Sequence, residues 1–113
     1  MVLLCLASLW HWTQREDCTV RNLSIGHWQA ARVFAVLGQA GNAAHYGELC
    51  LQHSEGEPPF YLAYAHEALA RAAMTGGEKQ LMDKHLAEAK SLATQVADEE
   101  ERAALEKDLE SIH

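Results

Sequence analysis

The chain has few residues that could hold a fold together other than by packing: only three cysteines and two prolines among its 113 residues. Cys5, Cys18 and Cys50 are odd in number, widely spaced and without a Cys-x-x-Cys pair. This spacing argues against a disulfide framework and against a zinc knuckle. We expect reduced, buried thiols, because a cysteine outside a disulfide packs as a small hydrophobic residue.

Positive charge is also scarce. Nine Lys and Arg residues stand against sixteen Asp and Glu residues, which gives a formal net charge of -7, and the basic residues form no cluster or stripe. A chain of this charge repels phosphate backbones and anionic surfaces. We therefore expect neither nucleic acid nor a membrane as a partner.

One apolar run, Met1–Trp10, opens the chain, but it lacks both the basic n-region and the cleavage pattern of a signal peptide. It is also shorter than the roughly 20 apolar residues that span a bilayer. By elimination we expect a cytoplasmic location.

Helical periodicity is what the sequence does contain, and no segment alternates apolar and polar residues as a strand would. Turn signals divide the chain into helices predicted at 2–15, 25–40, 43–54, 59–75, 78–96 and 99–112. We predict one all-α domain over 1–113, made of an N-terminal helix and loop (1–24), two helical hairpins (25–97) and a C-terminal capping helix (98–113).

Capping residues support these divisions. Gly41 and Asn42 are predicted as the C′ glycine of one helix and the N-cap of the next, while Asp98 with Glu101 matches a capping box. Pro58-Pro59 suits the start of a helix, where a missing N–H costs nothing. The alanine-rich segment from Phe60 to Met74 can be approached closely on several sides, so we predict that it is the central helix.

The stretch Phe34-Ala-Val-Leu37-Gly38 resembles the Trp-x-x-Leu-Gly opening of a tetratricopeptide repeat, with Phe in place of Trp. Small residues of that family's second helix are matched by Ala44, Gly47 and Cys50. The sequence departs from the pattern at Gly41, Ser54 and Glu57, and the second hairpin follows the first at an offset of 39 rather than 34. The stretch Gly26-His-Trp28-Gln-Ala-Ala-Arg32-Val33 is also similar to one in bacterial proteins of uncharacterised function.

The tetratricopeptide resemblance implies antiparallel helical hairpins stacked in a short right-handed array of about six helices. In that family the first helix of each hairpin lines a concave face that binds peptides. Carried over to this chain, the candidate groove residues are Arg32, Gln39, Tyr61, Tyr64, Glu67 and Arg71. The alternative is that Tyr64 is packed and that Glu67 with Arg71 is a surface i,i+4 pair.

Motifs for catalysis and cofactor binding are missing from the sequence. There is no Gly-x-Ser-x-Gly elbow, and we predict no catalytic residue, cofactor or metal site. His45-x-x-Glu48 and His85-x-x-Glu88 each place an imidazole and a carboxylate one turn apart. Because neither pair has the Glu-x-x-His order of helical di-metal sites, we interpret them as polar residues on solvated helix faces.

The sequence thus predicts a non-enzymatic interaction module that binds a peptide in a concave groove or associates with itself. A homodimer through the apolar N-terminal helix would bury that helix. The alternative is a small-molecule sensor or small helical enzyme with a pocket between helices, using His66, Glu67 and Arg71 or the tryptophans Trp10, Trp12 and Trp28. A closed cavity with convergent polar groups would favour the alternative.

Overall fold

The computed structural model describes residues 20–113, with side chains from Ile25 onward. Several sequence predictions fall outside the described residues: the helix at 2–15 and its role in a homodimer, together with Cys5, Cys18, Trp10 and Trp12.

Residues 20–113 form five α-helices and contain no strand, which confirms the all-α prediction for this part of the chain. The helices are α2 (Val20–Val36), α3 (Ala40–Ser54), α4 (Pro59–Thr75), α5 (Lys79–Ala93) and α6 (Glu99–Glu110). None of these described helices combines the length and the apolar character needed to cross a membrane.

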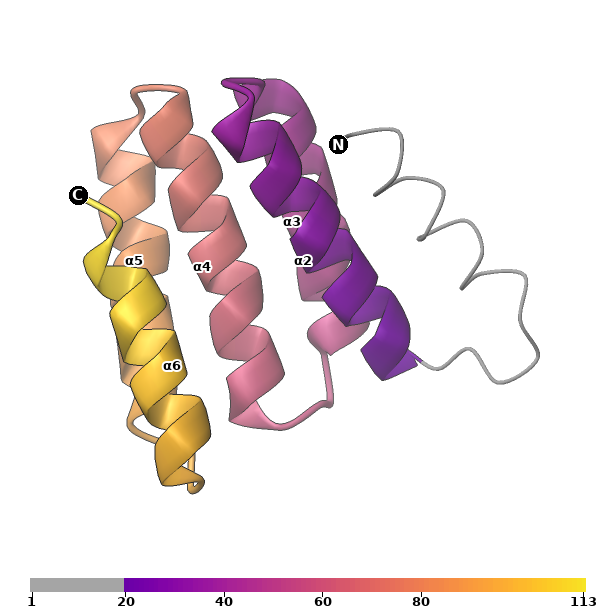
Figure 1. The fold of residues 1–113 in the computed structure, drawn as a ribbon, viewed down its shortest axis with the longest axis vertical. Helices are drawn as coiled ribbons and strands as arrows, with labels where there is room; N and C mark the ends of the chain where they lie inside the picture. The colour runs from indigo at the N-terminus through magenta and orange to yellow at the C-terminus, as the bar shows by residue number, and fades with distance from the viewer. Residues whose placement is uncertain (1–19) are drawn as a thin grey trace.

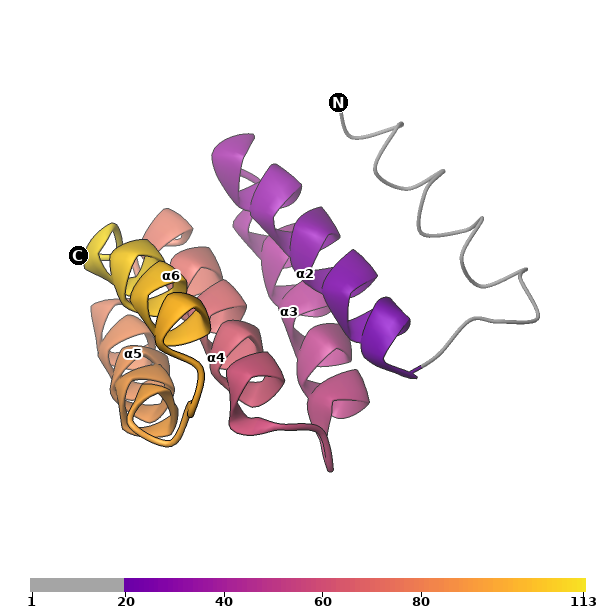
Figure 2. The same cartoon turned by 60° about the horizontal axis from the view of Figure 1, so that its bottom comes forward.

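Neighbouring helices run antiparallel and form two hairpins, α2 with α3 and α4 with α5 (Figure 1). The hairpins meet where α4 packs against both α2 and α3, and α6 packs against α4 and α5. In the turned view, α2 and α6 lie above α3 and α5 (Figure 2). Of the described helices only α4 contacts all four others, so the predicted central helix is confirmed.

Small side chains let α4 be surrounded in this way. Its buried alanines are Ala63, Ala65, Ala68, Ala70, Ala72 and Ala73. On the facing helix α3, a Cβ atom added to Gly47 would lie only 2.9 Å from Leu69 Cδ2. A side chain at position 47 would therefore require the Leu69 side chain to move. The thiol of Cys50 on the same helix is buried as predicted.

The turn between α2 and α3 differs from the prediction. Gly38, with a φ of +76°, is the residue that reverses the chain, because glycine adopts this left-handed conformation without steric cost. Consequently α2 ends at Val36 rather than at residue 40, and Gln39 occupies the N-cap position of α3. The assignment of Gly41 and Asn42 as C′ and N-cap is wrong, since both lie in the first turn of α3.

The remaining boundaries agree more closely with the sequence. The side chain of Asp98 accepts a hydrogen bond of 3.0 Å from the Glu101 N–H, which confirms the predicted N-cap. Pro59 opens α4, and the Gly77 backbone, with a φ of +73°, separates α4 from α5. In contrast, α2 begins at Val20, inside the segment predicted as a loop, and α5 ends at Ala93 rather than at residue 96.

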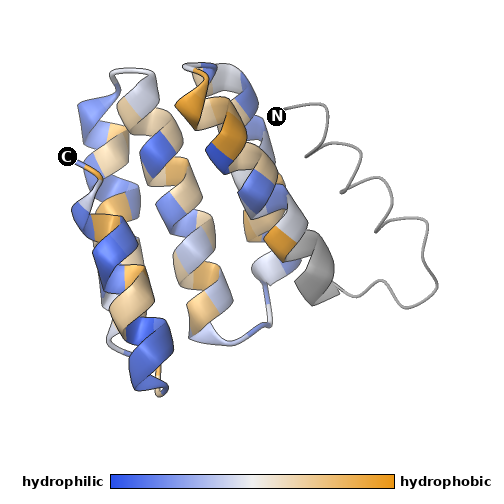
Figure 3. Ribbon diagram, viewed as in Figure 1, coloured by the Kyte–Doolittle hydropathy of each residue, from blue (hydrophilic) through white to orange (hydrophobic). Residues whose placement is uncertain are grey.

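The main core lies between α4, α5 and α6. It contains the two predicted apolar stripes: Met82, Leu86, Ala89, Ala93 and Val96 on one side, and Leu105, Leu109 and Ile112 on the other. The ribbon of α6 carries both strongly hydrophilic and apolar positions (Figure 3). The terminal helix is thus amphipathic and covers the core with its apolar face.

Replacing Leu105 with alanine tests this core. Leu105 is 0% exposed, so its truncation should lower the free energy of unfolding by about 3 kcal/mol in urea titrations followed by circular dichroism. Leu81, which is 41% exposed on α5, provides the matched control. Equal losses for Leu105→Ala and Leu81→Ala would contradict the assigned role of α6.

Candidate functional site

A buried carboxylate joins the two hairpins. Glu67 of α4 is 0% exposed, and both of its carboxylate oxygens accept hydrogen bonds. Trp28 Nε1 on α2 donates to Oε2 at 2.6 Å, and Arg71 Nε, one turn further along α4, donates to Oε1 at 2.8 Å. Burying a carboxylate without hydrogen-bond donors would cost much free energy. Glu67 can therefore be buried here only because Trp28 and Arg71 donate to its oxygens.

The same network extends to the terminal helix. Arg71 Nη2 donates to the main-chain oxygen of Asp108 at 3.2 Å and to Ser111 Oγ at 2.7 Å. The Tyr64 hydroxyl donates to Asp108 Oδ2 at 2.7 Å. We call Arg32, Glu67, Arg71 and Asp108 the charge cluster; it links α2, α4 and α6.

Tyr64 is held in its protonated, donating form. Burial raises the pKa of its hydroxyl well above the usual value, and the hydrogen bond to Asp108 and the negative charge of that carboxylate raise it further. Tyr64 is therefore a fixed hydrogen-bond donor at any physiological pH.

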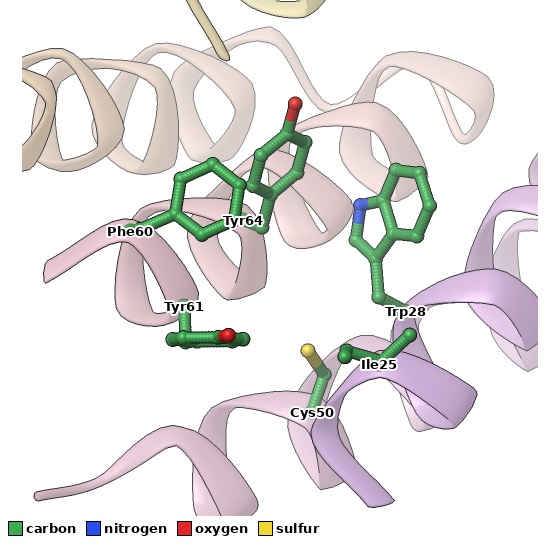
Figure 4. A pocket seen from close by; sticks show the side chains of 6 residues that line it. All are labelled: Ile25, Trp28, Cys50, Phe60, Tyr61 and Tyr64. Atoms are coloured by element: carbon green, nitrogen blue, oxygen red, sulfur yellow. The ribbon is translucent and has the colours of Figure 1, made fainter. Parts of the chain in front are cut away.

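An aromatic pocket lies beside the charge cluster. It has a volume of about 260 Å³ and is lined by Ile25, Trp28, Cys50, Phe60, Tyr61 and Tyr64 (Figure 4). The rings brace one another edge to face, with centroids 5.2 Å apart for Trp28 and Tyr64 and 5.1 Å apart for Phe60 and Tyr64. Since α2 and α4 supply five of these six side chains and α3 supplies one, the pocket lies where the two hairpins meet.

The polar atoms of two pocket residues are already engaged. Trp28 Nε1 donates to Glu67, and the Tyr64 hydroxyl, which in Figure 4 points away from Tyr61, donates to Asp108. The surface that these two rings turn to the pocket is therefore apolar, and an apolar group is what the pocket can hold.

Arg32 is the least constrained member of the charge cluster. Its Nη1 lies 3.9 Å from Glu67 Oε1 and 3.8 Å from Asp108 Oδ1, which are ion-pair distances but too long for hydrogen bonds. Its guanidinium carbon lies 5.7 Å from the centre of the Trp28 ring, and its side chain is 36% exposed. Arg32 forms no hydrogen bond with the described side chains, so its N–H donors can bind an incoming anionic group.

Four of the six predicted groove residues, Arg32, Tyr64, Glu67 and Arg71, meet in this network. Tyr61 lines the adjoining pocket. Gln39 lies in the α2–α3 turn, where its side-chain oxygen accepts a hydrogen bond from Asn42 rather than from the cluster. Whether these residues bind a partner stays a prediction.

The alternative interpretation holds in part. Tyr64 is packed against Trp28 and Phe60, and Glu67 and Arg71 form the i,i+4 pair. The pair does not lie on the surface, because Glu67 is fully buried.

Sequence reasoning also missed Asp108 and Ser111, which it assigned only to a capping helix. The sequence offers one signal for these two residues, which is their position. Asp108 directly precedes Leu109 and Ser111 directly precedes Ile112, and both of these apolar residues are buried in the core.

A second polar region surrounds His27 on α2. His27 is 8% exposed, and its Nδ1 has no hydrogen-bond partner among the described residues. Its ring centroid lies 4.9 Å from that of His53. Burial, together with the charges of His53 and His45, lowers the pKa of His27 to about 4.

Within residues 20–113, no three His, Cys, Asp or Glu side chains are grouped as metal ligands. Comparison of the chain with known protein families, with curated proteins and with solved structures finds no match. Any function must therefore be inferred from the geometry of the described residues.

Substitution of Glu67 with glutamine tests the buried network. A glutamine amide must place an NH₂ group against either the Trp28 N–H or the Arg71 guanidinium, so one buried donor loses its acceptor. We expect a loss of about 3 kcal/mol in the free energy of unfolding, measured with urea. Glu106→Gln, on the exposed side of α6, should change it by less than about 0.5 kcal/mol.

The buried His27 predicts a pH dependence of stability. Its pKa is about 4 in the folded chain against 6.5 when unfolded, so the unfolded state binds more protons between these values. Its contribution is complete above pH 6.5 and is lost as the pH falls towards 4, by roughly 3 kcal/mol.

The measurement is the free energy of unfolding at several pH values for wild type and for His27→Phe. The difference between the two removes the titration of the other histidines and of the carboxylates. Parallel curves over this pH range would refute the assignment to His27.

Proposed function

We propose that this protein is a non-enzymatic interaction module that binds an extended peptide segment where α2 and α4 meet. One observation carries the proposal: an apolar aromatic pocket lies next to Arg32, whose N–H donors are unsatisfied by hydrogen bonds among the described residues. A peptide could satisfy both features by inserting an apolar side chain into the pocket and presenting the carboxylate of a nearby residue to Arg32.

The size of the pocket favours part of a larger partner over a whole small molecule. Its 260 Å³ are below the roughly 300–1,000 Å³ of typical ligand sites and suit one or two large side chains. Trp28, Tyr61, Tyr64 and Arg32 are also of the types that dominate binding energy at protein interfaces, and Trp28 and Tyr64 are braced by their neighbours. Rigid walls reduce the entropy lost on binding.

The architecture supports the same proposal through the tetratricopeptide resemblance. We infer that α2–α3 and α4–α5 are two repeat-like hairpins in a right-handed array and that α6 begins a third unit. The first helices α2, α4 and α6 would then form the concave, peptide-binding face, and the charge cluster links these three. A cytoplasmic location and a homodimer through the apolar N-terminal helix predicted at 2–15 remain part of this proposal.

A second candidate function is that of a sensor for a small apolar molecule held in the same pocket. The apolar lining supports it, as does the position of the pocket between helices. A helical enzyme has less support, because the polar atoms of Trp28 and Tyr64 are committed to Glu67 and Asp108. Catalysis would need an acid or base directed at the bound molecule.

Selection from a displayed random-peptide library tests the peptide proposal. We expect wild type to enrich sequences in which an acidic residue lies within two or three positions of a large apolar one. Arg32→Glu and Ile25→Trp, which reverse the charge and fill the pocket, should weaken a selected peptide at least tenfold in fluorescence anisotropy. This is about 1.4 kcal/mol, the scale of one charged contact or buried side chain.

The matched controls are Lys107→Glu on the exposed side of α6 and Leu37→Trp in the α2–α3 turn, where Leu37 is 46% exposed. All variants are compared at equal helical content by circular dichroism. Failure to enrich any motif, or equal affinity loss in variants and controls, would overturn the proposal. Stoichiometric binding of a small apolar dye that Ile25→Trp abolishes, without peptide enrichment, would favour the sensor.

A further inference from the structure

Two histidines meet on the side of α4 that faces α5. His66 of α4 and His85 of α5 are both half-buried, and their Nδ1 atoms lie 3.1 Å apart. Two nitrogen ligands on one tetrahedral zinc ion, each bonded at 2.0–2.1 Å, are separated by about 3.3 Å. The two imidazoles thus already hold nearly the separation that a shared metal ion requires.

Two carboxylates lie near this pair. Glu88 follows His85 by one turn of α5, and Glu48 lines, together with His85, a cavity of about 200 Å³ between α3, α4 and α5. Both carboxylates act electrostatically on both imidazoles. Both are exposed and form no hydrogen bond or ion pair with another residue of 20–113, so their side chains are able to turn.

The surroundings of the pair shift the pKa values of both imidazoles in the same direction. Burial lowers the pKa of His66, and burial followed by the charge of His66 lowers the pKa of His85. Lys84 lowers both further, whereas Glu48 and Glu88 act in the opposite direction.

We propose that His66 and His85 form a binding site for a divalent transition-metal ion of the zinc class. The carboxylates of Glu48 and Glu88 complete the ligand set, with solvent in any remaining position. In the described side-chain positions no third ligand has joined the pair, so binding requires the exposed carboxylates to turn inward. Two imidazoles and carboxylate oxygens in a tetrahedral arrangement are a donor set that Zn²⁺ prefers.

This proposal departs from the expectation that the His-x-x-Glu pairs are only solvated surface residues. The sequence could not reveal the site, because His66 belongs to neither motif and reaches His85 only through the α4–α5 hairpin. The site lies on α3, α4 and α5, whereas the aromatic pocket lies between α2 and α4. It is therefore independent of the proposed peptide binding.

The experiment is a titration of the full 113-residue chain, without a polyhistidine tag, with Co²⁺ at pH 7.5. We expect visible d–d absorption of tetrahedral intensity and its loss on addition of Zn²⁺, which displaces Co²⁺ from such sites. No thiolate-to-cobalt charge-transfer band should appear, which separates this site from binding by cysteines. Isothermal titration with Zn²⁺ then gives the affinity.

His66→Gln and His85→Gln should each weaken Zn²⁺ binding by about tenfold or more. His45→Gln is the matched control, since His45 is exposed, lies one turn before Glu48 and packs its ring against Tyr46. Glu48→Gln and Glu88→Gln show which carboxylate contributes. Circular dichroism establishes that each variant is folded.

Absence of d–d absorption in folded wild type would overturn the proposal and leave His66 and His85 as a hydrogen-bonded pair. Equal weakening by His45→Gln and His85→Gln would also overturn it. A thiolate-to-cobalt band that persists in both His66→Gln and His85→Gln would assign the metal to cysteines instead.

Discussion

The burial of the Glu67 carboxylate is the constraint on which the rest of the described structure depends. A charged group with no solvent exposure must have its lone pairs filled, and the donors come from α2 and from the next turn of α4. Trp28 is 39 residues away in sequence, so its hydrogen bond sets how α2 lies along α4. Arg71 then joins α4 to Ser111 just beyond α6. Buried ion pairs add little net stability but disfavour other helix registers.

The same constraint shapes the candidate binding surface. Because Trp28 must direct its N–H to Glu67, its ring stands against Tyr64, and the two form one wall of the aromatic pocket. Arg71, with the shorter contact, satisfies Glu67 Oε1, so Arg32 is left with only long ion pairs. A partly exposed guanidinium above an aromatic ring is a common recognition element for carboxylates. The features that support peptide binding thus follow from how the hairpins are locked together.

Local signals in the sequence predict the existence of the five described helices, but not all of their ends and not the contacts between them. The alanines between Phe60 and Met74 indicated a central helix, and Asp98 with Glu101 marked a helix start, because both depend on neighbouring residues. Asp108 could not be assigned to Tyr64, since 44 residues separate them and only the packing of α6 brings them together. Two glycines near the first turn were each compatible with reversing the chain. Gly38 rather than Gly41 reverses the chain. The predicted C-terminal end of α2 and the predicted start of α3 are therefore wrong.

The alanine content of α4 also explains why its few large polar side chains find partners on both sides. Residues 64, 67 and 71 follow a spacing of three and four and share one side of the helix, whereas His66 is turned about 100° from Glu67. Hydrogen bonds between helices require short interaxial distances, and these are reached where the intervening residues are small. Larger side chains in place of Ala63, Ala70 or Ala73 would hold α5 and α6 away from α4. Tyr64 would then lose Asp108 and His66 would lose His85, so the small residues of α4 are the condition for both polar sites.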